Sequence, residues 1–511
     1  MRVPRRECSL VNVKRAAAMT ITVAAIGASG CGDESTTTTD PSKALAYMPA
    51  EPAVLAILDT DVDGDQVHGF EDTIGDGTPA EDVEQLIEEA ILEGSGISYE
   101  DDVRPLLGGP LVAAMDEPDE RTGDAGAVVA ALVVDDEDKA RETLDKVPGA
   151  ENVTYVGDGV VVAADSPESL SLARGREEAG EGFDPEAMTG AMEGLPDDAL
   201  LKLYADIDAG VLQLPELSGL ADQPWFESLR TLGATVSFDE SQMQANALLA
   251  TEGASAADLP LIPGTSESPE IVVRDGWISG ANLDQSRTTA FLLRAVRALF
   301  PHSDFVRDVE TVERERDIDF EREFLRQFNG PSQSLLSPDG GFAARSEVQD
   351  PQRLAATMEK IAPDLGRLVE DLQGLQSTGL GALLLLAPDA PAATSVLGSA
   401  NVKVEPLRDD LYRMSGLVGP GPNEIVFGLV DDVFVVAEDE EAAQEIASAP
   451  TEAFDGPRGA AVVRASGTAL QELATDFLGI GSPGRLASEI EGSLAAEEDG
   501  LRGRLVAEFG D

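Results

Sequence analysis

The chain has 511 residues, with 96 Asp and Glu against 36 Lys and Arg, and a formal net charge of −60. Its length predicts two or three domains, and an apolar fraction of 42% is compatible with folded cores. The acid excess argues against nucleic acid as a partner, because phosphate binding depends on clustered Lys and Arg. We interpret the charge as general solubility, with cation binding as the alternative.

The first thirty residues have the pattern of an export signal. Five basic residues precede a charge-free run from Ala16 to Ala28, which is too short to span a bilayer. Ala28-Ser29-Gly30-Cys31 then resembles the bacterial lipobox, whose cysteine is acylated and becomes the new N-terminus. We therefore predict a lipoprotein signal peptide over 1–30, lipid attachment at Cys31 and a location at the outer face of the bacterial cytoplasmic membrane. An ordinary signal peptide with an incidental cysteine is the alternative.

Residues 31–43 are predicted to form an acidic, Thr-rich tether, because after Cys31 they offer no apolar side chain to bury. A first α+β unit is predicted over 44–255. Apolar and alternating runs predict strands at 53–58, 109–115, 127–134, 160–164, 200–204 and 244–250. A capping box at Thr78 predicts a helix with an apolar stripe up to Ile91, and the turn around Asp158 favours a hairpin.

Asp59, Asp61 and Asp63 follow the first predicted strand and resemble the start of an EF-hand calcium loop. Position 12 of such a loop should be Glu, and Phe70 stands there instead. We favour a solvated acidic loop, with calcium binding as the alternative. Only two histidines occur, His68 and His302, so a three-His metal site cannot form, and we interpret both as surface residues.

Several segments resemble one bacterial family. They are Tyr47-Met48-Pro49-Ala50, the run from Tyr99 to Gly109, the strand-to-helix passage from Ala127 to Ala140, and the run from Asp158 to Ala164. Together they are similar to the domain-of-unknown-function family DUF 3352, best across 44–215, although Leu106 stands where the family would have Trp. The resemblance implies an exported or membrane-anchored envelope protein, and it implies no activity, cofactor or catalytic residue.

A Pro-rich linker is predicted over 256–269 and a second α+β unit over 270–511. The second unit has a predicted helix with an apolar stripe from Phe291 to Phe300, and predicted strands at 425–429 and 433–437. Three segments of the first unit match three of the second in the same order: 99–110 with 320–331, 136–147 with 350–361, and 158–165 with 431–438. We therefore expect an α+β fold of two related halves, each a mainly antiparallel sheet with helices packed on one face.

Familiar catalytic motifs are absent: the sequence has no P-loop, Ser-x-x-Lys, Gly-x-Ser-x-Gly or His-Glu-x-x-His pattern. Gly479 to Gly484 has Gly-x-Gly-x-x-Gly spacing but follows a predicted helix, so we interpret it as a helix-to-helix turn. The apolar run 379–388 is too short to span a bilayer and is interpreted as a core strand or buried helix.

We accordingly predict no catalytic residue, cofactor or metal site. We expect an exported, lipid-anchored envelope protein that is not an enzyme and that acts by binding or scaffolding, with a small molecule or a protein as its ligand. One alternative is a transporter-associated solute-binding lipoprotein. Another is a hydrolase that works with an Asp or Glu pair inside a cleft.

Overall fold

The computed structural model describes residues 40–61, 64–74, 98–117, 126–147, 149–207, 223–239, 241–254, 258–264, 267–338, 341–375, 399–408, 410–417, 423–467, 469 and 487–509. The chain divides into two compact units. Unit 1 comprises Met1–Leu217, Leu229–Glu252 and Glu508–Asp511, and unit 2 comprises Ser218–Ser228 and Gly253–Ala507. Both units combine helices with antiparallel strands, so the expected mixed helix-and-strand class with antiparallel pairing is confirmed.

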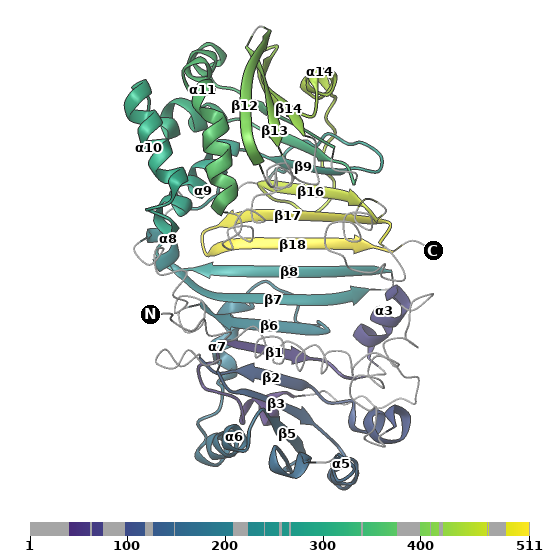
Figure 1. The fold of residues 1–511 in the computed structure, drawn as a ribbon. Coiled ribbons are helices and arrows are strands. Elements are labelled where there is room, and N and C mark those ends of the chain that lie inside the picture. The colour runs from purple at the N-terminus through teal and green to yellow at the C-terminus, as the bar shows by residue number, and fades with distance from the viewer. Residues whose placement is uncertain are drawn as a thin grey trace. The chain divides into compact units, whose positions relative to one another are not determined.

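The sheet of unit 1 has the strand order β4-β5-β3-β2-β1-β6-β7-β8, with every neighbouring pair antiparallel (Figure 1). Its strands are β1 (Val54–Leu58), β2 (Leu111–Met115), β3 (Val128–Val133), β4 (Thr154–Gly157), β5 (Val160–Ala164), β6 (Leu201–Asp206), β7 (Leu229–Asp239) and β8 (Gln242–Thr251). Asp158 and Gly159 join β4 to β5 with φ angles of 56° and 76°. Two successive positive φ values are what a two-residue hairpin turn requires, so the predicted hairpin is confirmed.

One face of this sheet carries the main core of unit 1. Leu55, Val112 and Val162 are fully buried there, beneath α2 (Ser42–Leu45), α6 (Pro167–Ala179) and α7 (Pro185–Ala191). Helix α6 begins where the hydroxyl of Ser166 accepts a hydrogen bond from the Ser169 N–H, 3.1 Å away, with Pro167 in the first turn. Its end is set by Gly180, which adopts the left-handed conformation common after a helix.

Helix α3 (Asp65–Ile74) packs against the opposite face of the same sheet. Its Phe70 ring meets the ring of Phe238 edge-on, with centroids 5.2 Å apart. Gly233 faces α7, since a Cβ atom there would overlap the main-chain oxygen of Ala191. Because successive strand residues point to opposite faces, Phe238 faces away from α7. The expectation of helices on one face is therefore wrong for unit 1.

The sheet of unit 2 has the order β12-β13-β14-β15-β11-β10-β9-β16-β17, again antiparallel throughout. Its strands are β9 (Ile278–Asn282), β10 (Ser332–Leu336), β11 (Phe342–Glu347), β12 (Ser399–Arg408), β13 (Leu411–Leu417), β14 (Glu424–Val430), β15 (Val433–Ala437), β16 (Ala461–Ser466) and β17 (Glu489–Glu497), followed after a two-residue turn by β18 (Gly500–Glu508).

Seven strands of unit 2 follow the same order as seven strands of unit 1: β14-β15-β11-β10-β9-β16-β17 against β4-β5-β3-β2-β1-β6-β7. The turns agree as well, because Asp431 and Asp432 join β14 to β15 with φ angles of 49° and 67°. A π-helical turn that runs into a 3-10 turn precedes both β2 and β10, at Tyr99–Val103 with Arg104–Leu106 and at Phe320–Phe324 with Leu325–Gln327. The β12–β13 hairpin has no counterpart among the described strands of unit 1.

Helices cover both faces of the unit 2 sheet. Ile425 and Phe427 of β14 lie in a core with α11 (Pro351–Leu375), whereas Val426 lies in a separate core with α14 (Glu440–Ser448). The one-face expectation is therefore wrong here too, because an apolar strand without polar alternation is buried on both sides. The remaining described helices are α5 (Glu137–Leu144), the 3-10 turn Ala150–Asn152, α8 (Pro224–Glu227), α9 (Gln285–Leu299) and α10 (Asp304–Arg316).

All eight predicted strands are confirmed, and so is the predicted helix that includes Phe291, which is α9. Within the segment predicted as a linker, Leu259 and Leu261 are buried against Ala460 and Ala461. The helix predicted from Thr78, the run 379–388 and the glycine motif at 479–484 lie outside the described residues. None of the described helices is both long enough and apolar enough to cross a bilayer.

Candidate functional site

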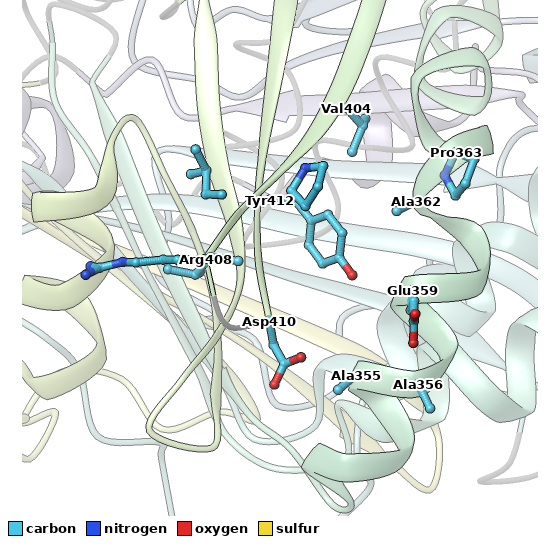
Figure 2. Close-up of a pocket in the computed structure, with 12 residues that line it drawn as sticks. Ala355, Ala356, Glu359, Ala362, Pro363, Val404, Arg408, Asp410 and Tyr412 are labelled. Atoms are coloured by element: carbon cyan, nitrogen blue, oxygen red, sulfur yellow. The ribbon is translucent and has the colours of Figure 1, made fainter.

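A groove of about 700 Å³ lies in unit 2, between α11 and the β12–β13 hairpin (Figure 2). We call it the α11–β12 groove. Small and apolar side chains form most of its walls: Ala355, Ala356, Ala362 and Pro363 from α11, and Val404, Pro406, Leu407 and Leu411 from the hairpin. Glu359, Arg408, Asp410 and Tyr412 complete its lining.

Packing beneath the groove holds its two sides in place. Leu354 and Met358 of α11 are fully buried in one core with Met414 and Phe427. The Tyr412 ring stacks on Phe427, with centroids 5.6 Å apart and an angle of 21° between the planes. Since β13 and β14 place these two residues directly opposite each other, the floor of the groove is a fixed aromatic surface.

Pro363 lies inside α11, and proline has no N–H to donate to the carbonyl four residues earlier. The main-chain oxygen of Glu359 therefore lacks its usual helical donor. Both residues line the groove. The wall formed by α11 therefore offers this main-chain oxygen as a hydrogen-bond acceptor.

Two carboxylates stand beside the tyrosine. Figure 2 shows the Tyr412 hydroxyl pointing toward α11, on the side where Glu359 lies, with Asp410 below it. Burial raises the pKa of Tyr412, and the negative charges of Asp410 and Glu359 raise it further. Both carboxylates are exposed, and within the described part of the chain neither forms an ion pair. The groove therefore has a negative potential at the hydroxyl of Tyr412.

Arg408, the basic residue of the lining, points away from these two carboxylates (Figure 2). The side chain of Arg408 extends away from Tyr412 in Figure 2, and its Nε lies 3.2 Å from a carboxylate oxygen of Glu440 on α14. Arg408 therefore does not neutralise Glu359 or Asp410.

Among the described strands, β12 lies at an edge of the unit 2 sheet, and its main chain is protected from further pairing. The Val402 N–H donates to the Glu370 carboxylate of α11 at 2.6 Å. Lys403 and Pro406 are both exposed on this strand, and charged residues and proline are common protective features of sheet edges. The groove is therefore suited to side-chain recognition more than to the addition of another strand.

The residues predicted from the sequence do not form a site in the described structure. Cys31 and Asp63 lie outside the described residues. The Asp59 carboxylate accepts a hydrogen bond from the Asp61 N–H at 3.0 Å, and its pKa is raised by burial. No group of three potential metal ligands occurs among the described residues, and calcium binding at this loop stays the alternative to a solvated acidic loop. His68 and His302 are both exposed, as predicted.

A carboxylate pair and a single carboxylate with a shifted pKa lie outside the groove. Asp308 of α10 and Asp371 of α11 share a hydrogen bond, and burial together with Asp308 raises the pKa of Asp371 to about 6. Carboxyl groups in direct contact are closer than the roughly 5 Å or more used by paired-carboxylate glycosidases. The buried Asp102 accepts hydrogen bonds from Lys146 at 2.6 Å and Lys139 at 3.2 Å, which hold its pKa at about 2.

No protein-family model matches the chain, and no curated protein sequence matches it. Among solved structures, it is similar to crystal form I of TP0453 at 8% identity and a TM-score of 0.23, over 52% of this chain and 87% of that one. It is similar to crystal form III of TP0453 at 7% identity and the same TM-score, over 42% of this chain and 81% of that one.

Proposed function

We propose that this protein is an exported, lipid-anchored cell-envelope protein that works without catalysis, by binding a ligand in the α11–β12 groove. The observation that carries the binding role is the groove itself, which has apolar walls, a fixed aromatic floor and two carboxylates that form no ion pair with any described residue. Export and anchoring are supported by the charge-free run ending in Ala28-Ser29-Gly30-Cys31. The resemblance to DUF 3352 belongs to the same proposal.

We further propose that the two units arose by duplication of one α+β unit. The shared order of seven strands supports this, and so do the paired π-helical turns. The N-caps at Asp136 and Asp350 correspond as well, each accepting a hydrogen bond from the N–H three residues later. On this proposal, among the described residues, the β12–β13 hairpin and the long α11 distinguish the second copy, and the groove lies between them.

Anchoring is tested by phase partitioning of cells that express the full chain or its Cys31→Ala variant. We expect wild type to enter the detergent phase and to be digested by protease added to intact spheroplasts, because acyl chains hold it outside. The variant should move to the aqueous phase. Identical partitioning of the two proteins would contradict the proposal.

A further inference from the structure

We propose that the α11–β12 groove binds a basic peptide segment of a partner protein, holding an Arg or Lys side chain between Glu359 and Asp410. This inference rests on the proposed binding function and names the ligand class of that groove. The recognising features are the charges, the acceptors and the shape of the groove.

Hydrogen-bond acceptors dominate the polar groups of the groove. The carboxylates of Glu359 and Asp410 are acceptors only, and the main-chain oxygen of Glu359 lacks its helical donor because of Pro363. The hydroxyl of Tyr412 can accept as well as donate. A complementary ligand must therefore bring several donors, as an ammonium or guanidinium group does.

Electrostatics favour the same class of ligand. Arg408, the basic residue of the lining, is paired with Glu440, so the negative charge of the groove is not compensated from within. The chain as a whole carries a net charge of −60, which repels acidic partners and attracts basic ones. A cationic ligand is thus favoured both by the site and by the surrounding field.

The apolar walls suit the stem of a long basic side chain. Ala362 and Pro363 face the Tyr412 ring across the groove, so methylene groups can lie between them while the charged head reaches the carboxylates. The ring adds a cation–π contribution if the head lies over its face. Stacking on Phe427 keeps the ring in position before the ligand arrives.

An open groove favours a peptide over a free amine. Small-molecule sites normally bury most of the ligand, whereas Ala356, Glu359 and Pro363 are exposed along one wall of this groove and Pro406 along the other. A segment of a larger partner gains further contacts beyond the groove. Because Glu370 and Pro406 block strand addition along β12, the segment is held by its side chains.

The test uses detergent-solubilised full-length protein and fluorescence anisotropy with a fluorescein-labelled peptide of three Leu-Arg repeats. The matched peptide of three Leu-citrulline repeats keeps the shape and removes the charge. We expect the arginine peptide to bind at least tenfold more tightly and to weaken as salt is raised from 50 to 500 mM, because salt screens exposed charges.

Variants locate the site. Glu359→Gln and Asp410→Asn should each weaken binding about fivefold, and the double variant more than tenfold, as expected for losing partly exposed ion pairs. Glu405→Gln is the matched control, since it removes the same charge from β12. Glu405 lies between Val404 and Pro406 and so points to the other face of the strand. The affinity of Glu405→Gln for the arginine peptide should stay within twofold of the wild-type affinity.

Three outcomes would overturn the inference. One is equal affinity for the arginine and citrulline peptides. Another is an equal loss in Glu405→Gln and Glu359→Gln, which would show a general charge effect. The third is that n-octylamine displaces the peptide and binds as tightly as the peptide does. This result would make the groove a small-amine site and favour the solute-binding alternative. Each leaves the Cys31 partitioning result unaffected, so failure here is distinguishable from failure of the proposed anchoring.

Discussion

Gly366 determines how closely α11 approaches β12, and the variant Gly366→Ala tests this part of the structure. A Cβ atom at this position would lie 2.6 Å from the Val402 carbonyl oxygen and 3.2 Å from its carbonyl carbon. Relief requires α11 and β12 to separate by more than half an ångström, and overpacking of this kind costs about 2–3 kcal/mol. Alanine regains about 1 kcal/mol of helix propensity over glycine. We therefore expect a net loss of about 1–2 kcal/mol.

The matched control is Gly175→Ala in α6, where a Cβ atom would meet nothing within 4 Å. This variant should gain up to about 1 kcal/mol from helix propensity alone. Urea denaturation followed by circular dichroism gives both values, and we predict that the two variants differ by about 1–3 kcal/mol with opposite signs. Stabilisation of Gly366→Ala to the same extent as Gly175→Ala would refute the close approach of α11 to β12.

Three further substitutions test other contacts. The raised pKa of Asp371, about 6, means that its contribution to stability is present below pH 4 and is lost as pH rises through 6. In urea denaturation, the free energy of unfolding of Asp371→Asn should therefore exceed that of wild type by about 1–2 kcal/mol at pH 8 and equal it at pH 4. Equal free energies of the two proteins at both pH values would contradict the raised pKa. Arg345 donates to the carbonyls of Ile446, Ala447 and Ala449 at the end of α14. Arg345→Met should cost about 2–3 kcal/mol in the same assay, whereas a cost below about 0.5 kcal/mol would exclude the cap. The lowered pKa of Asp102 predicts that its contribution, present above pH 4, is lost as pH falls toward 2. In calorimetry, Asp102→Asn should then unfold at a lower temperature than wild type at pH 7 but not at pH 2. An equal lowering of the unfolding temperature at both pH values would contradict the lowered pKa.

Strands with a simple local pattern could be predicted from the sequence. The valine-rich runs 160–164 and 433–437 are bounded by Asp and Gly turns, and both have the predicted limits. Strand β10 could not be found in this way, because Ser332, Gln333 and Ser334 are polar and yet buried. Their burial depends on distant partners: the Gln333 side chain accepts a hydrogen bond from Arg345, and the Ser332 hydroxyl donates to Gln285. Such partners are not visible in local sequence.

The covering of the sheets was predicted less well than the strands. A continuous apolar run such as 425–429 indicates burial on both faces, yet the sequence does not show which helix supplies each cover. Phe427 packs toward α11 and Val426 toward α14, so the two faces of β14 are covered by helices from different parts of the sequence. The two-sided arrangement therefore depends on tertiary structure.

The groove was not predicted, although its hairpin left a signal. Val402, Val404 and Pro406 alternate with charged residues, and Asp409-Asp410 repeats the dipeptide of the turn at Asp431-Asp432. This pattern indicates a hairpin. Glu359 and Asp410, 51 residues later, line the same groove because of how α11 packs against β12, and no local pattern encodes that packing.

We propose above all that an acylated Cys31 holds this acidic chain at the outside of the membrane. The most direct test of this proposal is the intact mass of protein extracted from membranes by detergent. We predict a chain that begins at Cys31 and carries the added mass of its acyl groups, and the absence of this species when Cys31 is replaced by alanine. A mature chain that begins beyond residue 31, or an unmodified Cys31, would contradict it.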